Sequence, residues 1–157
     1  WLKDLIFQVH HEVNEKASEM DAEGMGTTIS LLYVYNNQIY QVHAGDSSIF
    51  RYRGGYLQKS TTDHTVRELA GDSNIPSNMI YSSIGGSNSV TADIKEISPE
   101  EGTFLLITDG VSDTLTEENM EIIIKNHKEK DVPEIMVNNA IASGSKDNCT
   151  AIICTIL

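Results

Sequence analysis

Basic residues are scarce in this sequence. Its 157 residues include 11 lysines and arginines against 23 aspartates and glutamates, so its formal net charge at pH 7 is −12. A chain this acidic is repelled by phosphate backbones and by anionic lipid headgroups. The charge balance therefore argues against nucleic-acid and membrane partners. Solubility explains most of the acidic excess, and the remainder is consistent with carboxylates gathered to hold a divalent cation.

Cysteine is rare as well. The two cysteines, Cys149 and Cys154, lie five positions apart on one predicted strand. Their side chains therefore point to opposite faces and cannot form a disulfide with each other. We interpret both as buried structural thiols of a protein in the reducing cytoplasm. No apolar run approaches membrane-spanning length, and the sequence shows no secretory signal peptide.

Several common functional motifs are also absent. The glycine-rich residues 24–28 precede a predicted strand and are not followed by Gly-Lys-Ser/Thr, which excludes a phosphate-binding P-loop. The His-Glu-x-x-His pattern of zinc hydrolases and the acidic loop pattern of EF-hands do not occur. Neither of these metal sites is therefore expected.

Hydrophobic periodicity predicts an α+β order of elements. One amphipathic helix is followed by two β-hairpins, a weakly structured insert, two strands, two helices and a final strand. The predicted segments are residues 2–15, 29–35 with 38–44, 48–53 with 56–59, the insert 60–89, 90–98, 104–107, 117–126, 131–143 and 149–157. Asn36-Asn37 is expected to form a two-residue turn with positive φ. Strands joined by hairpins favour antiparallel sheets that the helices cover.

The helical segments carry local signals that a structure can check. Neighbouring helical residues point about 100° apart, so His10 and His11 cannot chelate one metal ion, and we interpret both as surface histidines. Asp63-His64 is expected to cap a short helix that runs through residue 70. Thr116 is expected to cap the helix that follows it. Asp131 is expected to open a capping box, with proline in the first turn of its helix.

Three aspartates each lie next to an end of a predicted strand. The buried strand 104–107 runs into Asp109-Gly110, and the final strand begins directly after Asp147. If these two strands are antiparallel neighbours, both carboxylates lie at the same edge of the sheet. We expect Gly110 to let the backbone turn tightly beside Asp109. Asp46 follows another strand end, although Gly-Asp-Ser is also an ordinary turn sequence.

A carboxylate at the end of a core strand must be paired or bound to a metal ion. Carboxylate oxygens without cysteine or histidine select hard cations such as Mg²⁺, Mn²⁺ or Ca²⁺. Two such ions about 4 Å apart can generate hydroxide and clamp a phosphoryl oxygen. The three aspartates therefore suggest metal-assisted phosphate chemistry.

Five short motifs occur in an order and at a spacing that resemble the type 2C metal-dependent protein phosphatases, and more closely their bacterial members. They are Gly24-Met25-Gly26-Thr27-Thr28, Ala44-Gly45-Asp46-Ser47, Asp63-His64, Thr108-Asp109-Gly110 and Asp147-Asn148. Each motif is weak alone, and the five together are fairly specific. The resemblance implies an α+β fold in which two antiparallel β-sheets are sandwiched between helices. It also implies that residues 1–157 form a single phosphatase-like domain.

The same resemblance implies the chemistry of the site. Asp109 and Asp147 would be ligands of one catalytic Mn²⁺ or Mg²⁺ ion, and Asp46 would serve a further ion. The insert would be a flap beside the active site. A metal-activated water would hydrolyse phosphoserine and phosphothreonine without a covalent intermediate. The partners would be a phosphorylated protein substrate and a Ser/Thr kinase or its targets, in cytoplasmic signalling.

The sequence departs from the family pattern in its first motifs. The Arg-x-x-Asn-Glu-Asp and Asp-Gly-x-Gly-Gly stretches of the family are absent, and Ser48 stands where an arginine commonly follows Asp-Ser. These motifs supply the phosphate-binding arginine, the carboxylate that bridges two metals and, in some members, a general-acid histidine. No catalytic residue of these kinds is therefore assigned. We interpret the chain as the C-terminal part of such a domain, lacking its first strands.

Two other functions fit part of the pattern. A catalytically inactive phosphatase-like module could bind metal or regulatory partners, and the missing motifs favour it. A serine esterase could use Gly45-Asp46-Ser47, which resembles the Gly-Asp-Ser start of one lipase group. That group needs an Asp-x-x-His sequence, and no aspartate stands three positions before any of the five histidines. A serine without a placed base is inert, which argues against the esterase.

Overall fold

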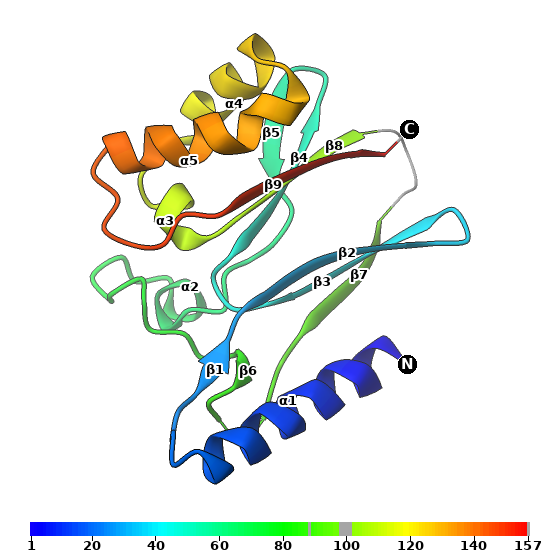
Figure 1. Cartoon of the computed structure of the whole chain (residues 1–157), viewed down its shortest axis with the longest axis vertical. Coiled ribbons are helices and arrows are strands. Elements are labelled where there is room, and N and C mark those ends of the chain that lie inside the picture. The colour runs from blue at the N-terminus through cyan, green and yellow to red at the C-terminus, as the bar shows by residue number, and fades with distance from the viewer. Residues whose placement is uncertain (88, 98–101, 157) are drawn as a thin grey trace. The chain divides into compact units, whose positions relative to one another are not determined.

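The computed structural model describes residues 1–87, 89–97 and 102–156 (Figure 1). The chain divides into two compact units, hereafter unit 1 and unit 2. Unit 1 comprises Trp1–Asp46 and Asp63–Pro99, and unit 2 comprises Ser47–Thr62 and Glu100–Leu157. Every strand pair in both units is antiparallel. The α+β class with antiparallel sheets, predicted from the sequence, is confirmed.

Unit 1 contains a three-stranded sheet, a short two-stranded sheet and two helices. The elements are α1 (Leu2–Glu19), β1 (Gly26–Thr27), β2 (Ile29–Tyr35), β3 (Gln38–Ala44), α2 (Val66–Ala70), β6 (Ile84–Gly85) and β7 (Asp93–Ile97). The larger sheet has the order β2-β3-β7, and β1 pairs with β6. Asn36 and Asn37 have φ values of 49° and 60°. They form the predicted two-residue turn between β2 and β3, which places Tyr35 opposite Gln38.

The core of unit 1 forms where α1 packs on the two sheets. Leu2 and Ile6 of α1 are buried with Val42 of β3 and Ile84 of β6. His10 is buried on the same helix, with only 3% of its surface exposed. Its Nδ1 accepts a hydrogen bond from the backbone N–H of Gly85 at 3.0 Å. The prediction of a surface position for His10 is therefore wrong, because β6, 75 residues later, supplies a buried donor.

The insert has more structure than the sequence suggested. The N-cap of α2 is Thr65, whose hydroxyl accepts a hydrogen bond from the backbone N–H of Glu68 at 3.2 Å. The cap predicted at Asp63-His64 is wrong, because Thr65 has the extended backbone and the hydroxyl that a cap requires. The insert also contributes β6.

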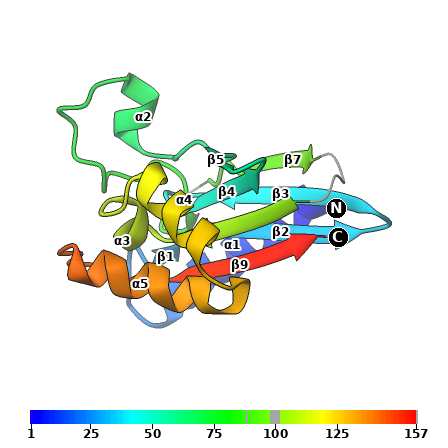
Figure 2. The same cartoon turned by 90° about the horizontal axis from the view of Figure 1, so that it is seen from above.

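Unit 2 is a four-stranded sheet with helices packed on one face. Its elements are β4 (Ser48–Arg53), β5 (Tyr56–Lys59), β8 (Gly102–Ile107), α3 (Asp109–Ser112), α4 (Glu117–Asn126), the 3₁₀ helix η1 (Glu129–Asp131), α5 (Val132–Ala142) and β9 (Ala151–Ile156). The strand order is β5-β4-β8-β9. Seen from above, α4 and α5 lie side by side (Figure 2). Leu105 and Ile107 of β8 pack with Val111 of α3, Met120 of α4 and Met136 of α5.

Two helix N-caps were predicted in unit 2, and the structure confirms only one of them. Thr116 caps α4: its hydroxyl accepts a hydrogen bond from the N–H of Asn119, and the Asn119 side chain completes a capping box. Asp131 makes no side-chain cap before α5. The capping box predicted there is wrong, because η1 brings Asp131 into helical φ and ψ angles, whereas a capping residue needs an extended backbone.

The cysteines also differ from the expectation. Cys154 lies in β9, but Cys149 precedes the strand, so the two do not share it. Both are half-buried and carry free thiols. Among the described residues, no helix is both long enough and apolar enough to cross a membrane.

Candidate functional site

Asp109 and Asp147 come together because β8 and β9 are neighbours. The two strands pair antiparallel, with Ile107 opposite Ala151. Asp109 is the first residue of α3, just beyond the end of β8, and Asp147 lies in the loop that leads into β9. The pairing on which the sequence argument depended is present in the structure.

Both aspartates line one pocket of unit 2, with a volume of about 300 Å³. The lining residues are Asp109, Gly110, Asp113, Thr114, Gly144, Ser145, Lys146 and Asp147. Asp109 is half-buried, and Asp113 and Asp147 are exposed. The pocket thus brings together three carboxylates, two hydroxyls and one ammonium group. Asp109 and Asp147 were predicted from the sequence, whereas Asp113 and the two hydroxyls carried no sequence signal.

Each of the two predicted ligands is held by the backbone beside it. Oδ1 of Asp109 accepts a hydrogen bond from the N–H of Gly110 at 2.9 Å. Oδ1 of Asp147 accepts one from the N–H of Asn148 at 2.7 Å. An ionised carboxylate has about four lone-pair sites, so each side chain is oriented and still retains capacity to bind a cation.

Gly110 has a steric role that the sequence argument did not identify. A Cβ atom at this position would lie 2.6 Å from the carbonyl oxygen of Asn148 and 3.2 Å from Sγ of Cys149. Gly110 lies within α3 and does not have positive φ. The backbone does turn here, from β8 into α3, but the turn does not use the positive φ that glycine allows. Glycine is needed because the loop that precedes β9 passes directly over it.

The donor set suits a hard cation. Carboxylate oxygens are typical ligands of Mg²⁺ and Mn²⁺, which keep several waters when few carboxylates bind them. Within residues 1–87, 89–97 and 102–156, no group of three or more His, Cys, Asp or Glu side chains is arranged to hold a metal ion. Asp109 and Asp147 are therefore the type of ligand that such a cation prefers, a pair of carboxylates.

Asp46 belongs to unit 1, where it lies two residues beyond the end of β3 and is half-buried. Gly45 before it has a φ of 114°, and a Cβ there would overlap the side chain of Thr28. The carbonyl of Gly45 accepts a hydrogen bond from the N–H of His64 at 2.7 Å. Three of the five sequence motifs therefore meet around Gly45 in unit 1, and the other two meet around Gly110 in unit 2.

The sequence argument also missed a buried polar cluster in unit 1. His43 and His64 are buried with their ring centroids 4.9 Å apart. Oγ of Ser30 lies 3.1 Å from Nδ1 of His43, and Oδ2 of Asp93 lies 3.7 Å from Nε2 of His64. Ser30, His43 and Asp93 are cross-strand partners on β2, β3 and β7. Only the register of this sheet could have revealed the cluster.

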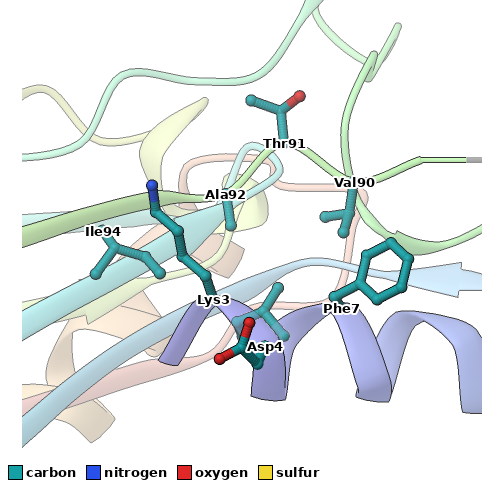
Figure 3. A pocket seen from close by; sticks show the side chains of 8 residues that line it. Lys3, Asp4, Phe7, Val90, Thr91, Ala92 and Ile94 are labelled. Atoms are coloured by element: carbon teal, nitrogen blue, oxygen red, sulfur yellow. The ribbon is translucent and has the colours of Figure 1, made fainter. Parts of the chain in front are cut away.

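Unit 1 also has a larger pocket, of about 430 Å³, between α1 and residues 90–94. Figure 3 shows Phe7 of α1 beside Val90, with Lys3 extending along Ala92 and Ile94. Its lining is mainly apolar and includes a single carboxylate, Asp4. This composition offers no paired oxygen ligands, so the smaller pocket of unit 2 is the better candidate for metal chemistry.

Comparisons with known proteins point in one direction. No protein-family model matches the sequence. The chain is 28% identical to the serine/threonine phosphatase stp of Listeria monocytogenes over 166 residues, covering 98% of the chain and 66% of stp. Its structure matches PppA of Pseudomonas aeruginosa with a TM-score of 0.87 and 26% identity, over 97% of this chain and 67% of PppA.

The chain resembles the bacterial type 2C protein phosphatases in sequence and in fold. It spans 66% of the length of the curated phosphatases that it matches. The catalytic domain of the serine/threonine protein phosphatase PstP, solved in complex with two manganese ions, matches with a TM-score of 0.78 over 94% of this chain and 67% of that domain. Its identity of 22% shows the fold alone. The resemblance to type 2C phosphatases stated from the sequence motifs is confirmed.

Proposed function

We propose that this chain is the C-terminal part of a metal-dependent protein serine/threonine phosphatase domain, extending over residues 1–157. The observation that carries the proposal is the shared pocket of Asp109 and Asp147, formed where β8 and β9 pair. Phosphatase relatives that match over nearly the whole chain support it. The substrates are phosphoserine and phosphothreonine proteins, such as a Ser/Thr kinase or its targets, in cytoplasmic signalling.

Asp109 and Asp147 hold one Mn²⁺ or Mg²⁺ ion in this proposal, and Asp46 serves a further ion. The two manganese ions bound to PstP support manganese as the metal. A bound divalent ion supplies a water of lowered pKa and a positive charge that attracts phosphoryl oxygens. The protein orients the two carboxylates through the N–H groups of Gly110 and Asn148. Lys146 contributes a positive charge to the lining of the same pocket, where it can attract a phosphate.

Metal binding is tested by titrating Mn²⁺ into the chain by isothermal calorimetry. Asp109→Asn and Asp147→Asn should each weaken binding by at least about 10-fold, because each removes a charged ligand from a hard cation. Asp113→Asn is the matched control: it removes the same charge from the same pocket, and we expect Mn²⁺ affinity to stay within about 3-fold of wild type. Equal effects of all three substitutions, or of none, would rule out a site built on Asp109 and Asp147.

A catalytically inactive binding module is the second candidate, favoured by the absent Arg-x-x-Asn-Glu-Asp and Asp-Gly-x-Gly-Gly motifs. We propose that this chain alone hydrolyses phosphoesters very slowly. Phosphoryl transfer depends on positioning and charge stabilisation, and the arginine that clamps phosphate is missing. Turnover of a phosphorylated peptide with Mn²⁺, compared with Asp109→Asn, tests this. Robust turnover that this substitution abolishes would instead mean that the chain carries a complete active site.

A further inference from the structure

Hydrogen bonds join the loop that carries Asp109 to the loop that carries Asp147. On one side of Asp109, the Thr108 hydroxyl donates to the carbonyl of Asn148 at 3.0 Å and accepts from the N–H of Thr150 at 3.0 Å. The backbone N–H of Thr108 also donates to the carbonyl of Thr150 at 3.1 Å. A single threonine side chain thus bridges two backbone groups of the facing loop.

A second link lies on the other side of Asp109. The Ser145 hydroxyl donates to the carbonyl oxygen of Gly110 at 2.7 Å. Sγ of Cys149 lies 3.3 Å from the same carbonyl oxygen and 3.3 Å from Oγ of Ser145. Because Gly110 has no side chain, the loop that carries Asp147 can approach this closely.

The two links bracket both aspartates. Thr108 and Gly110 are the chain neighbours of Asp109, and Ser145 and Asn148 lie within two residues of Asp147. Neither hydroxyl is needed for the β8–β9 ladder, which ends at Ile107 and Ala151. Two carboxylates that share an ion must be held at a fixed separation, and hydrogen-bonded partners outside the ligand set commonly provide this.

We propose that Thr108 and Ser145 are positioning residues that set the separation of Asp109 and Asp147, and we name these two side chains the Thr108–Ser145 clamp. The clamp rests on the proposed metal site, because only a shared ion makes that separation matter for function. Its hydrogen bonds exist without metal, so the clamp can also be measured in the metal-free protein. Thr108 and Ser145 act through the aspartates and do not themselves bind the ion.

The structure offers a matched control at the same carbonyl. The Thr114 hydroxyl donates to the carbonyl oxygen of Gly110 at 2.6 Å, but Thr114 follows α3 and links this loop only to itself. Thr114→Val therefore removes a hydroxyl from the same acceptor and the same pocket without loosening one loop from the other. Thr108→Val and Ser145→Ala remove the hydroxyls of the clamp, and Thr108→Ser restores one of them.

The experiment has two readouts, both on the 157-residue chain, with circular dichroism to verify folding of each variant. Without metal, amide exchange at Thr150 should be about 5- to 10-fold faster in Thr108→Val, because its N–H loses an acceptor. With Mn²⁺, Thr108→Val and Ser145→Ala should each bind about 10-fold to 100-fold more weakly, as is typical when a residue that orients a metal ligand is removed. Thr114→Val should stay within about 3-fold of wild type in amide exchange at Thr150 and in Mn²⁺ affinity. Thr108→Ser should restore both the exchange rate and the affinity to wild-type values.

The two proposals fail in distinguishable ways. Wild-type binding of Mn²⁺ that Thr108→Val and Ser145→Ala leave unchanged would overturn the clamp and leave the metal site standing. An equal loss of affinity in Thr114→Val would also overturn it, because that result would mean a general response to lost hydroxyls. If the wild-type chain binds no Mn²⁺, the metal site fails, and the clamp fails with it as a device for positioning metal ligands. Amide exchange would then still report whether Thr108 holds the two loops together.

Discussion

Gly110→Ala is the substitution for which the structure allows the sharpest estimate. The added Cβ would meet the carbonyl oxygen of Asn148 at 2.6 Å and the carbonyl carbon at 3.1 Å. These are backbone atoms, so the contact can be relieved only by moving the loop that precedes β9. Overpacking of this kind costs about 1–3 kcal/mol. Alanine in place of glycine within a helix returns about 0.5–1 kcal/mol, so we expect a net loss of about 1–2 kcal/mol.

Urea unfolding followed by circular dichroism measures this loss, as a lower midpoint at unchanged slope. The displaced loop carries Asp147, so Mn²⁺ affinity should fall together with the free energy of unfolding. Gly54→Ala is the control. Gly54 has a φ of 60° and open space around its Cβ position, so alanine there costs about 1–2 kcal/mol through backbone strain alone and should leave Mn²⁺ affinity unchanged. A Gly110→Ala chain as stable as wild type, with unchanged affinity, would refute the steric argument.

Three further predictions follow from local contacts. His10→Ala should lower the free energy of unfolding by about 1–3 kcal/mol, because the buried N–H of Gly85 loses its acceptor. Thr116→Ala should lower it by about 1 kcal/mol through loss of the α4 cap. Burial, and secondarily the charge of Glu129, raise the pKa of the Cys154 thiol. A raised pKa means less thiolate at a given pH, so Cys154 should alkylate more slowly than a free thiol at pH 8, and faster in Glu129→Gln.

Each of these predictions has a control in the chain. His11→Ala changes an exposed histidine that pairs with exposed Glu15 at 3.3 Å, and should alter the free energy of unfolding by less than about 0.5 kcal/mol. Asp131→Ala removes a side chain that makes no cap, so it should cost less than half as much as Thr116→Ala. Cys149→Ser isolates the alkylation signal of Cys154. If His11→Ala lowered the free energy of unfolding as much as His10→Ala, the buried role of His10 would be contradicted. An alkylation rate of Cys154 that is unchanged in Glu129→Gln would contradict the electrostatic effect.

Local signals in the sequence were enough for most elements. Asn36-Asn37 tolerates positive φ, so the hairpin of β2 and β3 could be placed to the residue. Thr116, with acidic residues after it, located the start of α4. Such features depend on the conformational preferences of a few adjacent residues, which the sequence displays directly.

Long-range contacts account for the wrong prediction at His10 and for the steric role of Gly110, which was not predicted. The burial of His10 depends on an N–H 75 residues away. Gly110 is a glycine because Asn148 passes above it, and not because its own backbone needs positive φ. At Asp131, the preceding 3₁₀ turn sets the backbone and removes the cap. The distant neighbours of His10 and Gly110 cannot be identified from the residues beside them in the sequence, whereas the turn at Asp131 is local and was not anticipated.

The candidate site likewise has features that the sequence predicted and features that only long-range contacts determine. The sequence alone identified Asp46, Asp109 and Asp147 as acids at strand ends, since a carboxylate beside an apolar run is visible in the residue order. Whether two of them meet depended on β8 and β9 being neighbours, a pairing that closes a loop of about 40 residues. Only the tertiary structure decided that pairing and the Thr108 and Ser145 hydrogen bonds across it, because hydrogen bonds between distant segments form only once the sheet has assembled.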